Sequence, residues 1–114
     1  MRRLEKIFKA LADRQRLRIL KMLEVKPMCV CEVTAILGVA QSSVSRHLAI
    51  LRDAGFIEDD KEGLWVNYSL VSSTDDVVAT VMTGLRRWGN DDGRISEDRK
   101  LAKAVSRGEI CARL

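Results

Sequence analysis

The chain has 114 residues, of which 46% are hydrophobic and 32% charged, enough apolar material for one packed domain and too little length for most metabolic enzyme folds. No apolar run approaches the roughly 20 residues that cross a bilayer, and the charged N-terminus lacks the apolar stretch of a signal peptide, so we expect a cytoplasmic protein without a membrane partner. The net charge of +4 is compatible with a nucleic-acid partner but does not require one.

Two helices are predicted at the start of the chain. Apolar residues recur at helical spacing over residues 4–11, which indicates an amphipathic first helix. Asp13 suits the N-cap of a second helix, and Pro27, the only proline, marks the break after it.

A helix-turn-helix is predicted next. A short third helix is expected over residues 30–37, with Gly38 at its C-cap. Only a few residues separate it from a fourth helix over residues 42–54, which Gly55 stops. Two helices joined by so short a connection are typical of a helix-turn-helix.

The second half of the chain predicts a hairpin, a helix and a charged tail. Strands are expected over residues 56–60 and 64–70, joined by a turn at 61–63. A fifth helix carries an apolar stripe that runs from Val78 to Trp88. Its other members are Val81, Met82 and Leu85.

The element order predicts a mainly α fold with a β-hairpin, a winged helix-turn-helix of about five helices and a two-stranded wing. Residues 1–89 would form the DNA-binding and dimerisation domain. Residues 90–114 would form a charged C-terminal tail, mobile or helical only in part, that carries Cys111.

The fourth helix presents a surface suited to the major groove. Val44, Leu48 and Leu51 fall on one side of a helical wheel, with Ser42 and Arg46 opposite. Small polar residues let a helix enter the groove, and arginine pairs with guanine. The alternative is a solvated helix whose serines only cap it. His47 falls beside the core face and suits packing or a phosphate contact better than a metal, because the chain has no second histidine.

Three segments resemble the ArsR-type (ArsR/SmtB) family of metal-responsive repressors: ALADRQRLRILKML, QSSVSRHLAILRDAGFIE and EGLWVNYSL. The resemblance covers most of the chain and implies a dimeric winged-helix repressor that leaves its operator DNA when a metal or metalloid binds. It also implies which residues enter the major groove: Gln41, Ser42, Ser43, Ser45 and Arg46. The wing departs from the family pattern, because it carries the acidic residues Asp59, Asp60 and Glu62, and carboxylates repel phosphate.

Three cysteines, an odd number, argue against a disulfide framework. If the third helix begins at Val30, Cys29 lies at its N-cap and Cys31 at its second position. The positive end of a helix favours thiolates, which are the ligands that thiophilic ions select. The alternative is two small buried hydrophobic residues.

The segment CVCEV resembles the CVCDLC motif of arsenite-responsive family members. Cys29 and Cys31 match the first two ligands, whereas Thr34 stands at the third position. Cys111, from the same subunit or its partner, is then either the third thiolate or an incidental tail residue. The resemblance implies no obligatory cofactor, with trivalent arsenic or antimony as inducer.

Other readings remain open. Cadmium- and lead-sensing relatives use a CxC here together with cysteines near the N-terminus, and residues 1–28 contain none. Zinc-sensing relatives use histidines with carboxylates on the last helix, where Asp75 and Asp76 have no histidine beside them. A thiol redox regulator would pair Cys111 with Cys29 or Cys31. A thiol enzyme would need a CxxC or a nearby base, which the chain lacks, so we expect no enzyme.

Finally, the apolar stripes of the first and fifth helices exceed what one winged helix buries. Packing them between two chains predicts a symmetric homodimer. Two recognition helices related by a two-fold axis then predict an inverted-repeat operator in double-stranded DNA.

Overall fold

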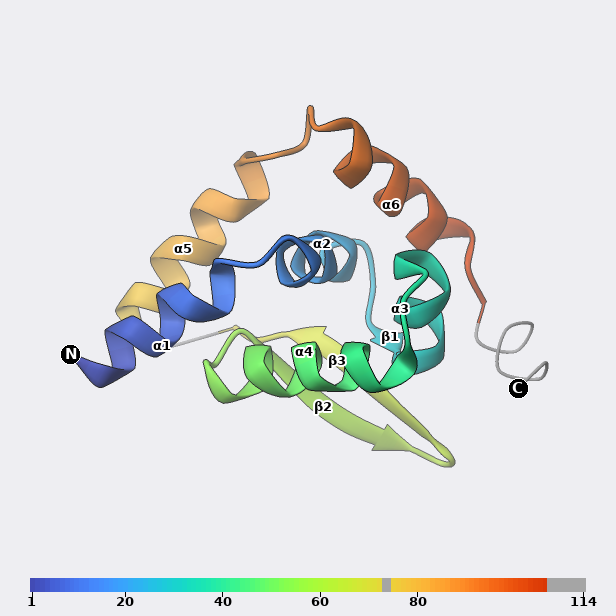
Figure 1. Ribbon diagram of the computed structural model, residues 1–114, viewed down its shortest axis with the longest axis horizontal. Helices are drawn as coiled ribbons and strands as arrows, with labels where there is room; N and C mark the ends of the chain where they lie inside the picture. Colours follow the sequence, from blue (N-terminus) through green and yellow to red (C-terminus); the bar gives the residue numbers. More distant parts are fainter. Residues whose placement is uncertain (73–74, 107–114) are drawn as a thin grey trace.

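The computed structural model describes residues 1–72 and 75–106 (Figure 1). Within these residues the chain forms a winged helix-turn-helix, as the sequence predicts. Its elements are α1 (Arg2–Leu11), α2 (Arg14–Leu23), β1 (Met28–Cys29), α3 (Val30–Leu37), α4 (Gln41–Asp53), β2 (Ile57–Glu62), β3 (Trp65–Leu70), α5 (Asp76–Arg87) and α6 (Gly93–Ala104).

Local signals in the sequence set the helix ends. Asp13 caps α2, and its carboxylate accepts the backbone N–H of Arg16 at 3.1 Å. Gly38 ends α3 in the left-handed conformation, at φ 70°, which a residue with a Cβ adopts only with strain. The expected bounds of α3 are confirmed, and α4 begins one residue before the expected position.

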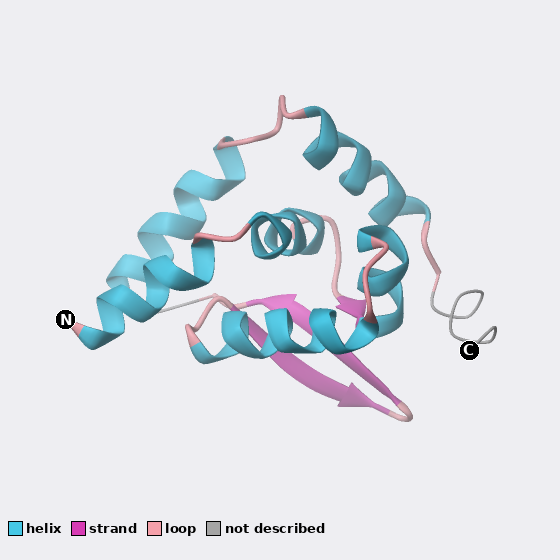
Figure 2. Cartoon of the chain, in the orientation of Figure 1, coloured by secondary structure: helices cyan, strands magenta, loops and turns pink. Residues whose placement is uncertain are grey.

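The sheet has a third strand that the sequence does not predict. All pairing is antiparallel in the order β1-β3-β2, and Cys29 of β1 lies opposite Asn67 of β3. A strand of two residues is too short to show the alternation that identifies strands. The wing itself, β2 with β3, projects from the helical body (Figure 2). Its turn lies at Gly63, slightly later than expected, because β2 continues to Glu62.

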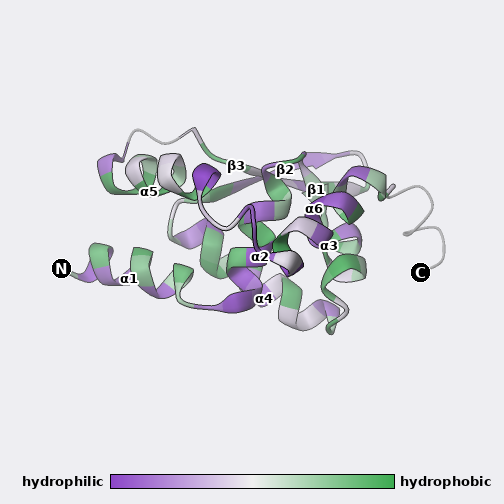
Figure 3. Ribbon diagram, turned by 90° about the horizontal axis from the view of Figure 1, so that it is seen from above, coloured by the Kyte–Doolittle hydropathy of each residue, from purple (hydrophilic) through white to green (hydrophobic). Residues whose placement is uncertain are grey.

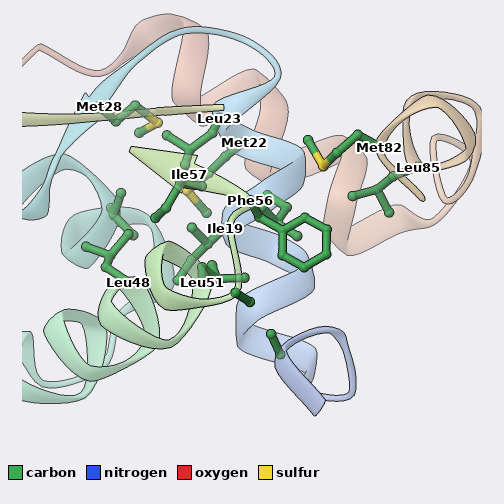
Figure 4. Close-up of a cluster of buried hydrophobic side chains, with 14 of the residues drawn as sticks. Ile19, Met22, Leu23, Met28, Leu48, Leu51, Phe56, Ile57, Met82 and Leu85 are labelled. Carbon is green, nitrogen blue, oxygen red and sulfur yellow. The ribbon is translucent and has the colours of Figure 1, made fainter. Parts of the chain in front are cut away.

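One aliphatic core joins the helices to the base of the wing. Figure 4 shows this cluster of buried side chains, which come from α2, β1, α4, α5 and the segment around β2. Its labelled members are Ile19, Met22, Leu23, Met28, Leu48, Leu51, Phe56, Ile57, Met82 and Leu85. Because α4 is anchored here by its inner face, its outer face is held outward.

Within the segment expected to be a charged tail, mobile or helical only in part, residues 93–104 form α6. This helix packs against α2 and α3 (Figure 1). Its buried residues are Ala102 and the charged Asp98, which is 0% exposed. A helix that docks through ion pairs shows little hydrophobic periodicity, and for this reason the sequence does not reveal it. Cys111 lies outside the described residues.

The expected apolar stripes are only partly buried. Ile7, Val78, Met82 and Leu85 are buried, but Trp88 is 60% exposed. On α1, hydrophobic and hydrophilic positions alternate along the ribbon in Figure 3. Leu4 and Phe8, the large exposed apolar residues of that helix, are 42% and 51% exposed. An apolar surface therefore remains on α1 and beside the end of α5 in the single chain.

Among the described residues, no helix is both long enough and apolar enough to span a membrane.

Candidate functional site

The outer face of α4 carries the polar residues that the sequence assigns to DNA. Val44, Leu48 and Leu51 are fully buried, which orients the opposite side of the helix to solvent. Four of the five candidate side chains are exposed and Ser43 is half-buried. The exposed four are Gln41, Ser42, Ser45 and Arg46. They occupy the first two turns of α4, the part of a recognition helix that meets base edges.

The N-terminus of α4 is not closed by a side chain. Its N-cap is Ala40, which makes no side-chain cap hydrogen bond. The first N–H groups of the helix, at the positive end of its dipole, are the kind of donors that bind phosphate. This end of α4 therefore suits an anionic partner.

His47 on α4 is held by an arginine from α2. Nη1 of Arg16 lies 3.2 Å from Nδ1 of His47, while the same guanidinium donates to the carbonyl oxygens of Ala10 and Lys9 at 2.8 and 3.0 Å. Burial acts to raise the pKa of the adjacent Asp13 carboxyl, but the backbone N–H and the charge of Arg16 outweigh it, so this pKa is lowered. His47 thus links α4 to the end of α1, a role that sequence spacing does not reveal.

The wing is acidic on its exposed strand. Asp59 accepts a hydrogen bond from Arg52 of α4 at 3.1 Å, and Glu62 accepts one from Asn67 at 2.9 Å. Asp60 is exposed on the same strand. A phosphate backbone approaching this hairpin would meet carboxylates, which repel it.

Cys29 and Cys31 lie at the first turn of α3, as expected. Cys29 is the N-cap and is 3% exposed, while Cys31 is half-buried at the second helical position. Glu32 forms a capping box with Cys29, in which its Oε1 accepts the Cys29 N–H at 3.0 Å. The spacing N-cap-x-x-Glu is the sequence signal for this box, and Glu32 is the residue that the cysteine pattern alone misses.

Thr34 occupies the position that matches the third cysteine of the CVCDLC motif. Thr34 follows Cys31 by three residues and so lies on the same side of α3. Its Oγ1 is buried and has no hydrogen-bond partner among the described residues. Within residues 1–72 and 75–106, no three histidine, cysteine or acidic side chains gather as a metal site. The described chain thus offers two thiols and one hydroxyl here.

The chain that leaves α6 passes beside this turn. The ammonium of Lys26 donates to the carbonyl oxygen of Val105 at 2.7 Å. Val105 and Ser106 line a small hollow together with Pro27 and Glu32. Because Glu32 caps Cys29, residue 106 lies beside the first turn of α3, on the same chain.

The fold and the outward face of α4 define the class: this is a winged helix-turn-helix protein. Residues 13–59 match the family model described as "Bacterial regulatory protein, arsR family". The arsenical resistance operon repressor of Bacillus subtilis (strain 168) is 44% identical over 71 residues, which cover 61% of this chain and 68% of that protein. The chain therefore belongs to the ArsR family, whose members are regulatory proteins and not enzymes.

Two further similarities agree with this assignment. The arsenical resistance operon repressor of Escherichia coli (strain K12) is 46% identical over 65 residues, and the match spans 56% of each chain. The chain thus matches little more than half the length of that relative. Among solved structures, HlyU from Vibrio cholerae N16961 superimposes with a TM-score of 0.64 at 33% identity, covering 76% of this chain and 91% of that one.

Proposed function

We propose that the protein is a homodimeric transcriptional repressor that binds an inverted-repeat operator through α4. Trivalent arsenic or antimony releases it by binding the thiolates of Cys29, Cys31 and Cys111. One observation carries the proposal: the two thiols lie at the first turn of α3, and α3 packs directly against α4. The similarity to two arsenical resistance repressors supports the choice of inducer.

DNA binding rests on the shape and charge of α4. Ser42 and Ser45 are small enough to let the helix approach base edges, and Arg46 reaches from the same face. The uncapped N-terminus at Ala40 adds backbone donors for a phosphate. With the acidic wing contributing little, specificity depends on the first two turns of α4.

Release of DNA follows from strain in α3. Cys29 is the N-cap and has an extended backbone, so its thiolate lies outside the regular turn that carries Cys31, and the two thiolates reach one ion when this end of the helix rearranges. An ion on the Cys29 sulfur displaces the backbone N–H of Glu32 from it and so distorts the capping box between Cys29 and Glu32. Since α3 packs on α4, the ion binds the distorted form more tightly and shifts the population away from the DNA-competent one.

A third thiolate is needed because Thr34 supplies only a hydroxyl, a hard and weak ligand for a soft ion. We infer that Cys111 of the same subunit supplies it. Ser106 lies beside Glu32, and Cys111 follows Ser106 by five positions in the chain. Five extended residues span at most about 17 Å, which is ample for a thiol that starts beside the first turn of α3.

Dimerisation rests on the apolar surface left on one chain. Phe8 and Leu4 of α1 are half-exposed, and Trp88 is exposed where α5 ends. Asp75, the N-cap of α5, pairs with Arg3 of α1 at 2.9 Å, so the N-terminal ends of the two helices meet, while Trp88 lies at the other end of α5. Packing this apolar surface against its copy across a two-fold axis buries it and relates two α4 helices.

The decisive experiment titrates arsenite into the DNA complex. A fluorescein-labelled duplex, selected by the protein from a random library, reports binding by anisotropy. We expect arsenite to release wild-type protein, whereas the double variant Cys29→Ser, Cys31→Ser binds the duplex equally well and stays bound. The variant Thr34→Ala is the matched control on α3 and should still respond. If the double variant releases DNA on arsenite, the proposal is wrong. Parallel titrations with cadmium, lead and hydrogen peroxide test whether another metal, or oxidation of the thiols, releases the DNA instead.

A further inference from the structure

A cleft of 730 Å³ lies where α2, α3 and α6 meet, away from the first turn of α3. Its walls come from the start of α2, the last turn of α3 and the start of α6. Sites of 300 to 1,000 Å³ are, as a rough guide, the size that holds a small organic molecule. The cleft exists because α6 is docked on α2, and neither the DNA-binding face nor the thiols use it.

Two cationic side chains line this cleft without a counter-ion among residues 1–72 and 75–106. Arg14 and Arg94 are exposed, and neither guanidinium makes a hydrogen bond or ion pair with another described residue. Arg18 also lines the cleft, but Asp98 and Gln15 hold it in place. The carboxylate of Asp92 lies in the wall as well and accepts two backbone N–H groups at the start of α6. The balance of charge at the cleft is therefore positive.

Apolar side chains form the rest of the wall. Leu17 of α2, Ile36 of α3 and Ile95 of α6 line the same cleft and are each half-buried. Two unpaired guanidinium groups beside an apolar wall fit a molecule with an anionic group and a hydrophobic body. An inorganic anion would leave the apolar wall unused.

We propose that this cleft binds a small organic carboxylate with an apolar body. The carboxylate pairs with Arg14 and Arg94, and the body packs against Ile36 and Ile95. The two arginines come from α2 and α6, so the bound molecule bridges the two helices. The site lies beyond the proposed repressor function and requires neither arsenite nor DNA.

The test is a titration of the ¹⁵N-labelled full chain with three probes, followed by amide chemical shifts. The probes are 2-naphthoate, its uncharged analogue 2-naphthamide, and inorganic phosphate. We expect 2-naphthoate to shift the amides of Ile36, Leu37 and Ile95, and to bind about tenfold more tightly than either of the other two. The double variant Arg14→Gln, Arg94→Gln should weaken it by about tenfold.

The matched control is Arg86→Gln, Arg87→Gln, which removes two exposed arginines of α5 outside the cleft. It should bind 2-naphthoate as the wild type does. Both arginines of the test variant are exposed, so its amide spectrum should otherwise be unchanged. Equal binding of 2-naphthamide, or shifts confined to other elements, overturns the proposal. The proposal is also overturned if phosphate binds as tightly as 2-naphthoate and duplex DNA shifts the same amides. That result would assign the two arginines to the DNA backbone.

Discussion

Arg18 of α2 holds Asp98 of α6 through two parallel hydrogen bonds, from Nε to Oδ2 at 2.7 Å and from Nη2 to Oδ1 at 3.0 Å. Asp98 is 0% exposed, and its hydrogen bond raises the pKa of the Arg18 guanidinium above its ordinary value. Beside this pair, Glu24 accepts a hydrogen bond from Arg99 of α6 at 2.7 Å and forms an ion pair with Lys21 at 3.0 Å. Buried ion pairs therefore fasten α6 to α2.

Removal of one member of this pair should destabilise the protein. Asp98→Asn leaves the Arg18 charge without its partner, at a cost of about 3 kcal/mol in the free energy of unfolding. Urea unfolding at fixed protein concentration measures the loss. Glu97→Gln is the control, since Glu97 is the exposed neighbour on the same helix. The double variant Arg18→Met, Asp98→Leu should recover most of the loss, because an apolar pair needs no counter-charge. Equal stability of Asp98→Asn and wild type would contradict the role given to the pair.

Acid should weaken the link between α1 and α5. The backbone N–H of Val78 and the guanidinium of Arg3 lower the pKa of the Asp75 carboxyl from its ordinary value of 3.8. The stabilising ionised form is fully present above pH 3.8 and is lost as the pH falls through the lower, folded-state pKa. Asp75→Asn keeps a capping side chain but loses the charge.

The measurable result is a difference that depends on pH. The melting temperature of Asp75→Asn should lie below that of wild type at pH 7, and the gap should close as the pH falls below 3.8 and through the lowered pKa of the folded state. Asp76→Asn, the exposed neighbour at the start of α5, should show no such convergence. A gap that is constant from pH 7 to pH 2 would show that the Asp75 charge does not stabilise the fold.

Much of this architecture can be predicted from sequence, and α6 shows why some of it cannot. The helix-turn-helix and the N-cap position of Cys29 follow from apolar periodicity, Asp13 and Gly38, which act locally. Helix α6 is held by pairs such as Arg18 with Asp98, eighty residues apart in the chain. A charged side chain looks the same in sequence whether it is solvated or buried against a partner, so no local signal marks the docked helix.

The same reasoning applies to the candidate site. The outward side of α4 follows from the burial of Val44 and Leu48, which periodicity predicts. The contact of His47 with Arg16 and the two-residue strand that ends at Cys29 depend on tertiary packing. These contacts join segments that are distant in sequence. The sequence alone does not indicate which residues of those segments lie opposite each other.

Arg46 should carry much of the operator specificity. It is exposed on the outer face of α4 and has no hydrogen-bond partner among the described residues. Arg46→Ala should weaken binding to the selected duplex by roughly 1–3 kcal/mol and relax the base preference at one position of each half-site. Lys9→Ala, on α1, should change specificity far less. Anisotropy titrations at one fixed salt concentration provide the comparison. Unchanged affinity of Arg46→Ala for the duplex would contradict the placement of α4 in the major groove.

A charge on α1 should break the dimer. Phe8 is 51% exposed, and Phe8→Glu would place a carboxylate in the proposed interface, where it has no partner. Sedimentation at micromolar concentration should show a dimer for wild type and a monomer for this variant. Leu64→Glu is the control, because Leu64 is 95% exposed at the tip of the wing and lies far along the chain from α1. A monomeric wild type, or a Phe8→Glu dimer as stable as wild type, would rule out this interface.

Cys111 should bind the inducer in the subunit to which it belongs. Residues 105 and 106 lie beside Glu32 of their own chain, where the amide of Cys29 is capped, so the tail starts at its own thiol pair. In a mixed dimer, one subunit carries Cys29→Ser and Cys31→Ser, and the other carries Cys111→Ser. If each site is built from one chain, neither site of the mixed dimer is complete, and the arsenite affinity measured by Trp65 and Trp88 fluorescence falls well below wild type. If the tail crosses to the partner, one site of the mixed dimer is complete, and it binds arsenite at full affinity with half the wild-type stoichiometry. That result would contradict the assignment of Cys111 to the site of its own subunit. Wild-type affinity in a Cys111→Ser homodimer would show instead that Cys29 and Cys31 suffice, while leaving DNA release through α3 intact.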